Sequence, residues 1–93
     1  MINSELLGKL AYSKSGRDAG KYFLIIGIID DNYVYISDGD LRPIKKPKRK
    51  KVMHLNLTNE TAEDILKLIN SGEMVSNRMV KQYIQSMNSY EEV

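Results

Sequence analysis

One run of the chain, Tyr22–Ile29, limits the folds open to this sequence more than any other. Apart from Gly27, its residues are β-branched, aromatic or leucine, and no helix-capping residue or polar face divides them. A strand that is apolar at both alternating positions must be covered on both faces. Gly27 predicts a bulge or a sharp bend, as small barrels use at corners. The run is far shorter than the roughly 20 apolar residues of a membrane-spanning helix, so we expect no membrane partner.

Further short strands and tight turns flank this run. The turns are predicted at Asp30-Asp31-Asn32 and Ser37-Asp38-Gly39-Asp40. Several short strands within about 50 residues predict a small barrel or an open sandwich. We expect the other strands over Leu6–Ser13, Tyr33–Ile36, Val52–Leu55 and, as a short addition, residues 41–44.

The apolar period changes from that of strands to that of helices after Leu57. Thr61 is a candidate N-cap for the first helix, with Thr58 and Asn59 as alternatives, and Gly72 is a good helix stop. The two apolar stripes are Ala62, Ile65, Leu66 and Ile69, then Met79, Val80, Tyr83, Ile84 and Met87. Neither helix is long enough to be stable alone. We therefore expect one unit: a barrel over residues 1–57 and a helical hairpin over 58–93 packed on it.

Positive charge is concentrated in residues 42–51, which carry 7 basic side chains and no acidic one. The rest of the chain carries 7 basic and 12 acidic residues. Pro43 and Pro47 oppose regular pairing, so the segment is predicted to be a solvated loop that attracts anions. Its cations are Arg42, Lys45, Lys46, Lys48, Arg49, Lys50 and Lys51. Nucleic acid is the predicted partner; a loop that serves only solubility is the alternative.

The segment from Gly8 to Ile26, GKLAYSKSGRDAGKYFLII, resembles a KOW motif. That motif consists of two strands joined by a loop, with a glycine at the end of the loop. Gly20 stands at this position here. The continuation through residues 30–39 is similar to the KOW-containing large-subunit ribosomal proteins of the archaeal and eukaryotic "fourteen-e" and "twenty-seven-e" families. It looks most like short bacterial relatives described as KOW-domain RNA-binding proteins. The resemblance covers Leu7–Leu55, and the helical tail also looks like that bacterial group.

The resemblance implies a mainly β protein with α: an SH3-like (KOW) β-barrel of about five strands followed by two short C-terminal helices. It also implies RNA binding, commonly to ribosomal RNA. The chain departs from the ribosomal relatives because it lacks long basic extensions. An accessory, ribosome-associated role therefore stands beside that of a stoichiometric ribosomal component.

In the family, the loop between the first two strands contacts RNA, which here implies Lys14, Ser15, Gly16, Arg17 and Asp18. The chemistry agrees, because two cations flank a glycine turn whose backbone N–H groups can meet phosphate. Lys21 adds a cation at the end of the loop. We expect Asp18 to pair with Arg17 or Lys21, or to bond its own loop backbone. The alternative is a well-made turn that binds nothing.

Two strand tyrosines are candidates for base stacking. Alternation places Tyr33 and Tyr35 on one face, opposite Val34 and Ile36. Bases stack on exposed tyrosines. The favoured alternative is that the two rings cover the barrel core.

No catalytic constellation is visible. His54 is the only histidine, there is no cysteine, and the aspartates fall in turns without the spacing of a calcium loop. We therefore expect a noncatalytic protein with no metal, cofactor or small-molecule substrate. Without a signal pattern at its N-terminus, it is predicted to be cytoplasmic. The resemblance implies RNA as its partner, in the form of ribosomal RNA or the large ribosomal subunit. The alternative is an SH3-like protein-interaction module that docks on a component of the translation or transcription machinery.

Overall fold

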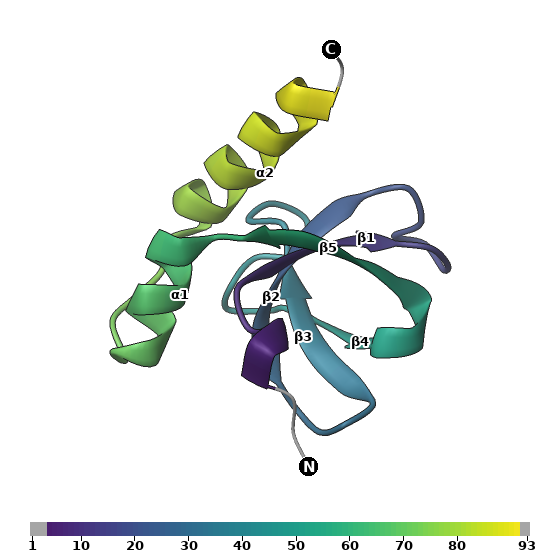
Figure 1. Ribbon diagram of the computed structural model, residues 1–93, viewed down its shortest axis with the longest axis horizontal. Coiled ribbons are helices and arrows are strands. Elements are labelled where there is room, and N and C mark those ends of the chain that lie inside the picture. The colour runs from purple at the N-terminus through teal and green to yellow at the C-terminus, as the bar shows by residue number, and fades with distance from the viewer. Residues whose placement is uncertain (1–3, 92–93) are drawn as a thin grey trace.

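Strand β2 (Tyr22–Ile28) is the middle strand of the sheet, as the apolar run predicts. The computed structural model describes residues 4–91, in which the strand order is β4-β3-β2-β1-β5 and all neighbours are antiparallel. The sheet curls into a small SH3-like barrel, followed by the two helices (Figure 1). The other strands are β1 (Lys9–Ser13), β3 (Tyr33–Ser37), β4 (Lys48–Lys51) and β5 (Leu55–Thr61).

Strand β2 contributes to a core on each of its faces, with Phe23 and Ile25 in one and Leu24 in the other. The inner core of the barrel holds Leu6 from the short 3-10 turn η1 (Ser4–Leu6), together with Ala11, Phe23, Ile25, Val34, Ile36 and Leu55. The pairing of β2 with β3 shifts register between Ile25 and Gly27, so the predicted bulge is confirmed. It bends β2 at the point where the sheet curls.

A second core lies between the outer face of β1–β2 and the helices α1 (Glu63–Asn70) and α2 (Asn77–Glu91). Its buried members are Leu10, Leu24, Ala62, Ile65, Val80 and Ile84, and Met79 and Met87 pack against them. The second predicted stripe is therefore confirmed as core, and so is the first except for Leu66, which is half-buried beside Gly8. Figure 1 shows both helices on one side of the barrel, with α2 running out beyond the sheet.

The predicted loop over residues 42–51 is wrong in its second half, because Lys48–Lys51 forms the edge strand β4 on β3. Pro47 immediately precedes this strand, where its missing N–H interrupts no ladder bond. Lysine stems can lie along an apolar surface, and charged edge strands resist pairing with other chains. The short strand expected over 41–44 is absent, and β4 takes its place as the fifth strand.

The region after β4 also differs from the prediction. The strand expected over Val52–Leu55 is a 3-10 turn, η2 (Val52–His54), and the true strand β5 begins at Leu55. Thr61, the last residue of β5, pairs with Lys9 of β1. The N–H of the next residue, Ala62, donates to the carbonyl oxygen of Gly8 over 2.9 Å. Extended pairing thus continues past the expected cap, and α1 begins at Glu63 with Ala62 at the N-cap position, which supplies no side-chain cap.

Candidate nucleic-acid interface

The β1–β2 loop is a tightly bonded turn that carries exposed cations. The N–H of Gly20 donates to Ser13 over 3.0 Å, and the N–H of Ala19 donates to Gly16 over 3.2 Å. Gly16 and Gly20 adopt φ of 80° and 85°, a left-handed conformation that costs glycine little. The side chains of Lys14, Arg17 and Lys21 are exposed. The loop therefore presents cations to solvent on a fixed backbone.

Lys50 supports this loop from beneath. It pairs with the buried Val34 on β3, so its side chain faces the inner side of the sheet. Lys50 is only 7% exposed, and its ammonium donates to the carbonyl oxygen of Ser15 over 2.8 Å. The expectation that Lys50 contacts RNA does not fit this placement, because the ammonium is already bonded inside the fold.

A second polar contact ties the same loop to the β3–β4 connection. The Arg42 Nε donates to Asp18 Oδ1 at 3.4 Å, and Asp18 is 6% exposed. The predicted pairing of Asp18 with Arg17 or Lys21 is wrong, because the curl of the sheet brings Arg42 to it. The backbone of Arg42 is also fixed, since its N–H donates to Asp38 Oδ1 and its carbonyl accepts the Ser37 hydroxyl. Arg42 therefore helps to hold the loop in place, and its contact with RNA stays a prediction.

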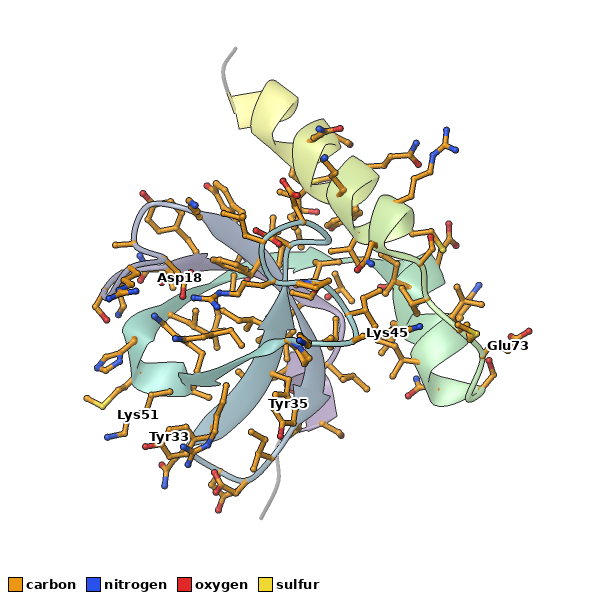
Figure 2. All side chains as sticks on the ribbon, turned by 180° about the vertical axis from the view of Figure 1, so that it is seen from behind. Asp18, Tyr33, Tyr35, Lys45, Lys51 and Glu73 are labelled. Carbon is orange, nitrogen blue, oxygen red and sulfur yellow. The ribbon has the colours of Figure 1, made fainter. Side chains whose placement is uncertain are left out.

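The outer face of β3–β4 combines tyrosines and cations. Tyr33 stands opposite Lys51 and Tyr35 opposite Arg49. The guanidinium of Arg49 reaches diagonally over the Tyr33 ring, with 3.9 Å from Cζ to the centroid, and the Lys51 ammonium lies 5.9 Å from that centroid. Figure 2 shows Tyr33 and Lys51 next to each other, with Tyr35 further along the strand. Sequence alternation predicts that the two tyrosines share one face of the strand, but it does not predict whether that face is the inner or the outer one.

Alternation along β4 divides the predicted basic cluster. Lys48 and Lys50 share the inner side with Ile36 and Val34, whereas Arg49 and Lys51 point outward. Lys45 and Lys46, before the strand, are exposed. The exposed or half-exposed cations of the loop and of residues 45–51 thus form a broad surface rather than one compact patch. Its members are Lys14, Arg17, Lys21, Lys45, Lys46, Lys48, Arg49 and Lys51.

Lys45 also lines an apolar cavity that sequence reasoning missed. The cavity has a volume of about 510 Å³ and lies between the sheet and the α1–α2 connection. Its apolar lining comes from Ile26, Ile44, Ile69, Met74 and Val75. Figure 2 shows Lys45 directed toward the helical side of the molecule, where Glu73 also lies. Only the folded chain brings these three separate segments together.

The described part of the chain, residues 4–91, holds no group of three His, Asp or Glu side chains able to bind a metal ion. His54 is exposed on η2. Asp30 and Asp38 accept backbone N–H groups within their own turns, which agrees with their prediction as turn residues. None of the helices in this region is both long and apolar enough to cross a bilayer.

Similarity to known proteins defines the class of this chain. No family model matches it. The large ribosomal subunit protein eL14 of Sulfolobus acidocaldarius is 30% identical over 80 residues, which cover 85% of this chain and 75% of that protein. The eL14 of Metallosphaera sedula is 33% identical over 57 residues, 61% of this chain and 59% of that protein. The Bacillus subtilis protein named "Putative ribosome-binding protein YbzG" is 28% identical over 72 residues, 77% of this chain and 97% of that protein.

The barrel and these similarities together define a KOW-type, ribosomal-protein-like chain. More particularly, the chain belongs to the eL14 family. It spans less than two thirds of the Metallosphaera protein and three quarters of the Sulfolobus one.

Proposed function

We propose that this chain is a noncatalytic, cytoplasmic RNA-binding protein that associates with the ribosome through ribosomal RNA of the large subunit. The observation that carries the proposal is the cationic surface over the β1–β2 loop and β4, in a chain of the eL14 family. An RNA backbone presents regularly spaced phosphates, and a broad cationic surface matches it better than it matches a single small anion.

The loop supplies the positioning contacts. Lys14 and Arg17 extend from a backbone that Lys50 and Arg42 hold in place. A fixed loop loses little conformational entropy when it docks, so more of each phosphate contact appears as affinity. Contacts to phosphate orient the protein on RNA without reading its sequence.

The test is a titration of a large-subunit ribosomal RNA fragment with a matched pair of variants. Lys14→Gln with Arg17→Gln removes one Lys and one Arg from the loop. Lys67→Gln with Arg78→Gln removes the same two charges from exposed helical positions. We expect only the loop variant to lower affinity, with a salt-dependence slope smaller by about 0.7 to 0.9 per lost phosphate contact. Equal losses in both variants would mean that only net charge matters and would contradict the proposal.

The cellular test is sedimentation of tagged protein in a sucrose gradient of lysate, with and without RNase. We expect migration with large subunits or whole ribosomes, shifted when the RNA is degraded. The loop variant should remain nearer the top of the gradient than the helical control. Wild-type protein that stays at the top of an untreated gradient argues against stable ribosome association.

The apolar cavity favours a second candidate function, a protein-interaction module that docks on a component of the translation or transcription machinery. Met74 at its rim is 84% exposed. An apolar side chain of a protein partner would bury Met74 and the three lining isoleucines. In that case ribosome association would survive RNase and would be lost in Met74→Glu, an exposed substitution that should leave the fold intact.

A further inference from the structure

The outer face of β3–β4 carries two tyrosines that neither core uses. Val34 and Ile36, which alternate with them, are fully buried in the inner core. Tyr33 and Tyr35 belong to neither the inner core nor the helix-covered core. The expectation that these rings cover the core is therefore wrong, and their presence on this face needs another reason.

Gly27 lets the Tyr35 ring lie close to the backbone of β2. The two residues are register partners, and a Cβ at Gly27 would stand only 3.3 Å from Cδ2 of the ring. The ring thus leans on the strand while 41% of the residue stays exposed. A tyrosine supported from one side and open on another is a ready platform for a planar ligand.

Arg49 forms a second planar surface beside the first. It stands opposite Tyr35, and its guanidinium lies 3.9 Å from the centre of the Tyr33 ring. Guanidinium planes stack on aromatic faces and on nucleobases, so Arg49 backed by Tyr33 can accept a base on its outer side. Lys51, above the same ring, places a further cation at the edge of this surface.

We propose that this platform, made of Tyr33, Tyr35, Arg49 and Lys51, binds unpaired bases of RNA. The inference rests on the proposed function and names the ligand class of that same surface: single-stranded or bulged RNA rather than a continuous duplex. In an A-form helix the bases are stacked on one another and only edges, phosphates and 2′-hydroxyls are accessible. Phosphates alone would use the cations but not two supported aromatic rings.

Three variants separate stacking from charge. Tyr35→Ala removes the ring, whereas Tyr35→Phe keeps it and loses only the hydroxyl. Arg49→Lys keeps the charge but replaces the planar group with an ammonium. Met53→Ala, at an η2 position that is 68% exposed, is the control for the loss of an exposed apolar side chain. Urea unfolding of each variant establishes that it is folded before binding is measured.

The probe is a short single-stranded RNA that contains 2-aminopurine, whose fluorescence is quenched on stacking, and the blunt duplex of the same sequence. We expect tighter binding of the single strand, with quenching. Tyr35→Ala should lose roughly 5- to 150-fold in affinity together with the quenching, because stacking of one base on an aromatic ring is worth about 1 to 3 kcal/mol. Tyr35→Phe and Met53→Ala should match the wild type, and Arg49→Lys should fall between them and Tyr35→Ala.

The outcomes distinguish this inference from the proposed function. Equal, salt-sensitive binding of single strand and duplex, unaffected by Tyr35→Ala, would overturn the stacking platform and leave RNA binding through phosphates standing. No binding of either RNA would overturn both. A loss in Tyr35→Phe as large as in Tyr35→Ala would also overturn stacking, because it would assign the effect to the hydroxyl.

Discussion

The ammonium of Lys50 donates a 2.8 Å hydrogen bond to the carbonyl oxygen of Ser15, and this bond joins the edge strand β4 to the β1–β2 loop. The two residues are 35 positions apart in the chain. The same loop is held at Asp18 by Arg42, from the connection that leads into β4. Two cations of the basic segment thus stabilise the loop, while their neighbours face solvent.

Lys50→Met tests this support. The methionine keeps most of the apolar stem but leaves the Ser15 carbonyl without the ammonium. We expect the free energy of unfolding to fall by about 1.5 to 3 kcal/mol, the range for a hydrogen bond to a charged group. The control is Lys46→Met, at an exposed position, which should change stability by no more than about 0.5 kcal/mol. Urea unfolding of both variants measures the difference, and equal midpoints would show that the Lys50 bond is not stabilising.

The ion pair of Asp18 and Arg42 predicts an asymmetric result. The Asp18 side chain is 8% exposed and that of Arg42 33%, so loss of the arginine leaves a buried carboxylate, whereas loss of the carboxylate leaves a cation that water can reach. We expect Arg42→Gln to cost about 2 to 3 kcal/mol and Asp18→Asn clearly less.

The double variant Asp18→Asn with Arg42→Gln completes a double-mutant cycle for this ion pair. It should recover most of the stability lost in Arg42→Gln, because no buried charge remains unpaired. Chemical denaturation of the four proteins at neutral pH gives the coupling energy. Additive losses would show that the two side chains act independently.

The sequence predicted those elements whose apolar pattern is strong. β2, β3 and both helices follow from β-branched runs and helical stripes, which report burial directly. β4 was missed because KRKK carries no apolar alternation. Its pairing depends on the free backbone edge of β3, which a local pattern does not reveal.

The sequence predicts which cations the candidate site contains, but not how they are arranged. Strand alternation within β4 decides which cations face solvent. The sequence predicts a loop for this segment, so it cannot predict that alternation. The contacts of Lys50 and Arg42 join residues 35 and 24 positions apart and exist only because the sheet curls. The platform tyrosines were identified as a pair, but their outward direction depends on which face of β3 the inner core covers.

Two glycines with similar backbone angles predict different costs of substitution. Gly39 and Gly72 both have φ of 74°. A Cβ at Gly39 would collide with the backbone carbonyl of Asn77 at the start of α2, whereas nothing lies within 4 Å of one at Gly72. We expect Gly72→Ala to cost about 1 to 2 kcal/mol, the cost of a left-handed alanine. Gly39→Ala should cost at least about 3 kcal/mol, because α2 must also shift.

The readout for the glycine pair is thermal or urea unfolding followed by circular dichroism. Similar losses in the two variants would contradict the close approach of the 37–40 turn to α2. A larger loss in Gly72→Ala would reverse the assignment. Either result would place the steric constraint elsewhere.

Tyr83 on α2 predicts how stability changes at alkaline pH. Burial raises the pKa of its hydroxyl above the ordinary value of 10.0, and the negative charges of Glu60 and Glu63 raise that pKa further. The folded protein therefore keeps this proton at a pH where the unfolded chain has lost it. Stability due to this difference is fully present below about pH 10 and falls as the pH rises toward the folded-state pKa.

Tyr83→Phe removes this ionisation, so its stability should fall less steeply than that of the wild type above about pH 10. The difference in slope is at most about 1.4 kcal/mol per pH unit, because one proton is involved. Urea unfolding at several pH values between about 8 and 11 measures it. Glu60→Gln should reduce the difference by removing one of the two charges that oppose the tyrosinate. Parallel profiles for the wild type and Tyr83→Phe would show that burial and the two carboxylates do not hold this proton in the folded state.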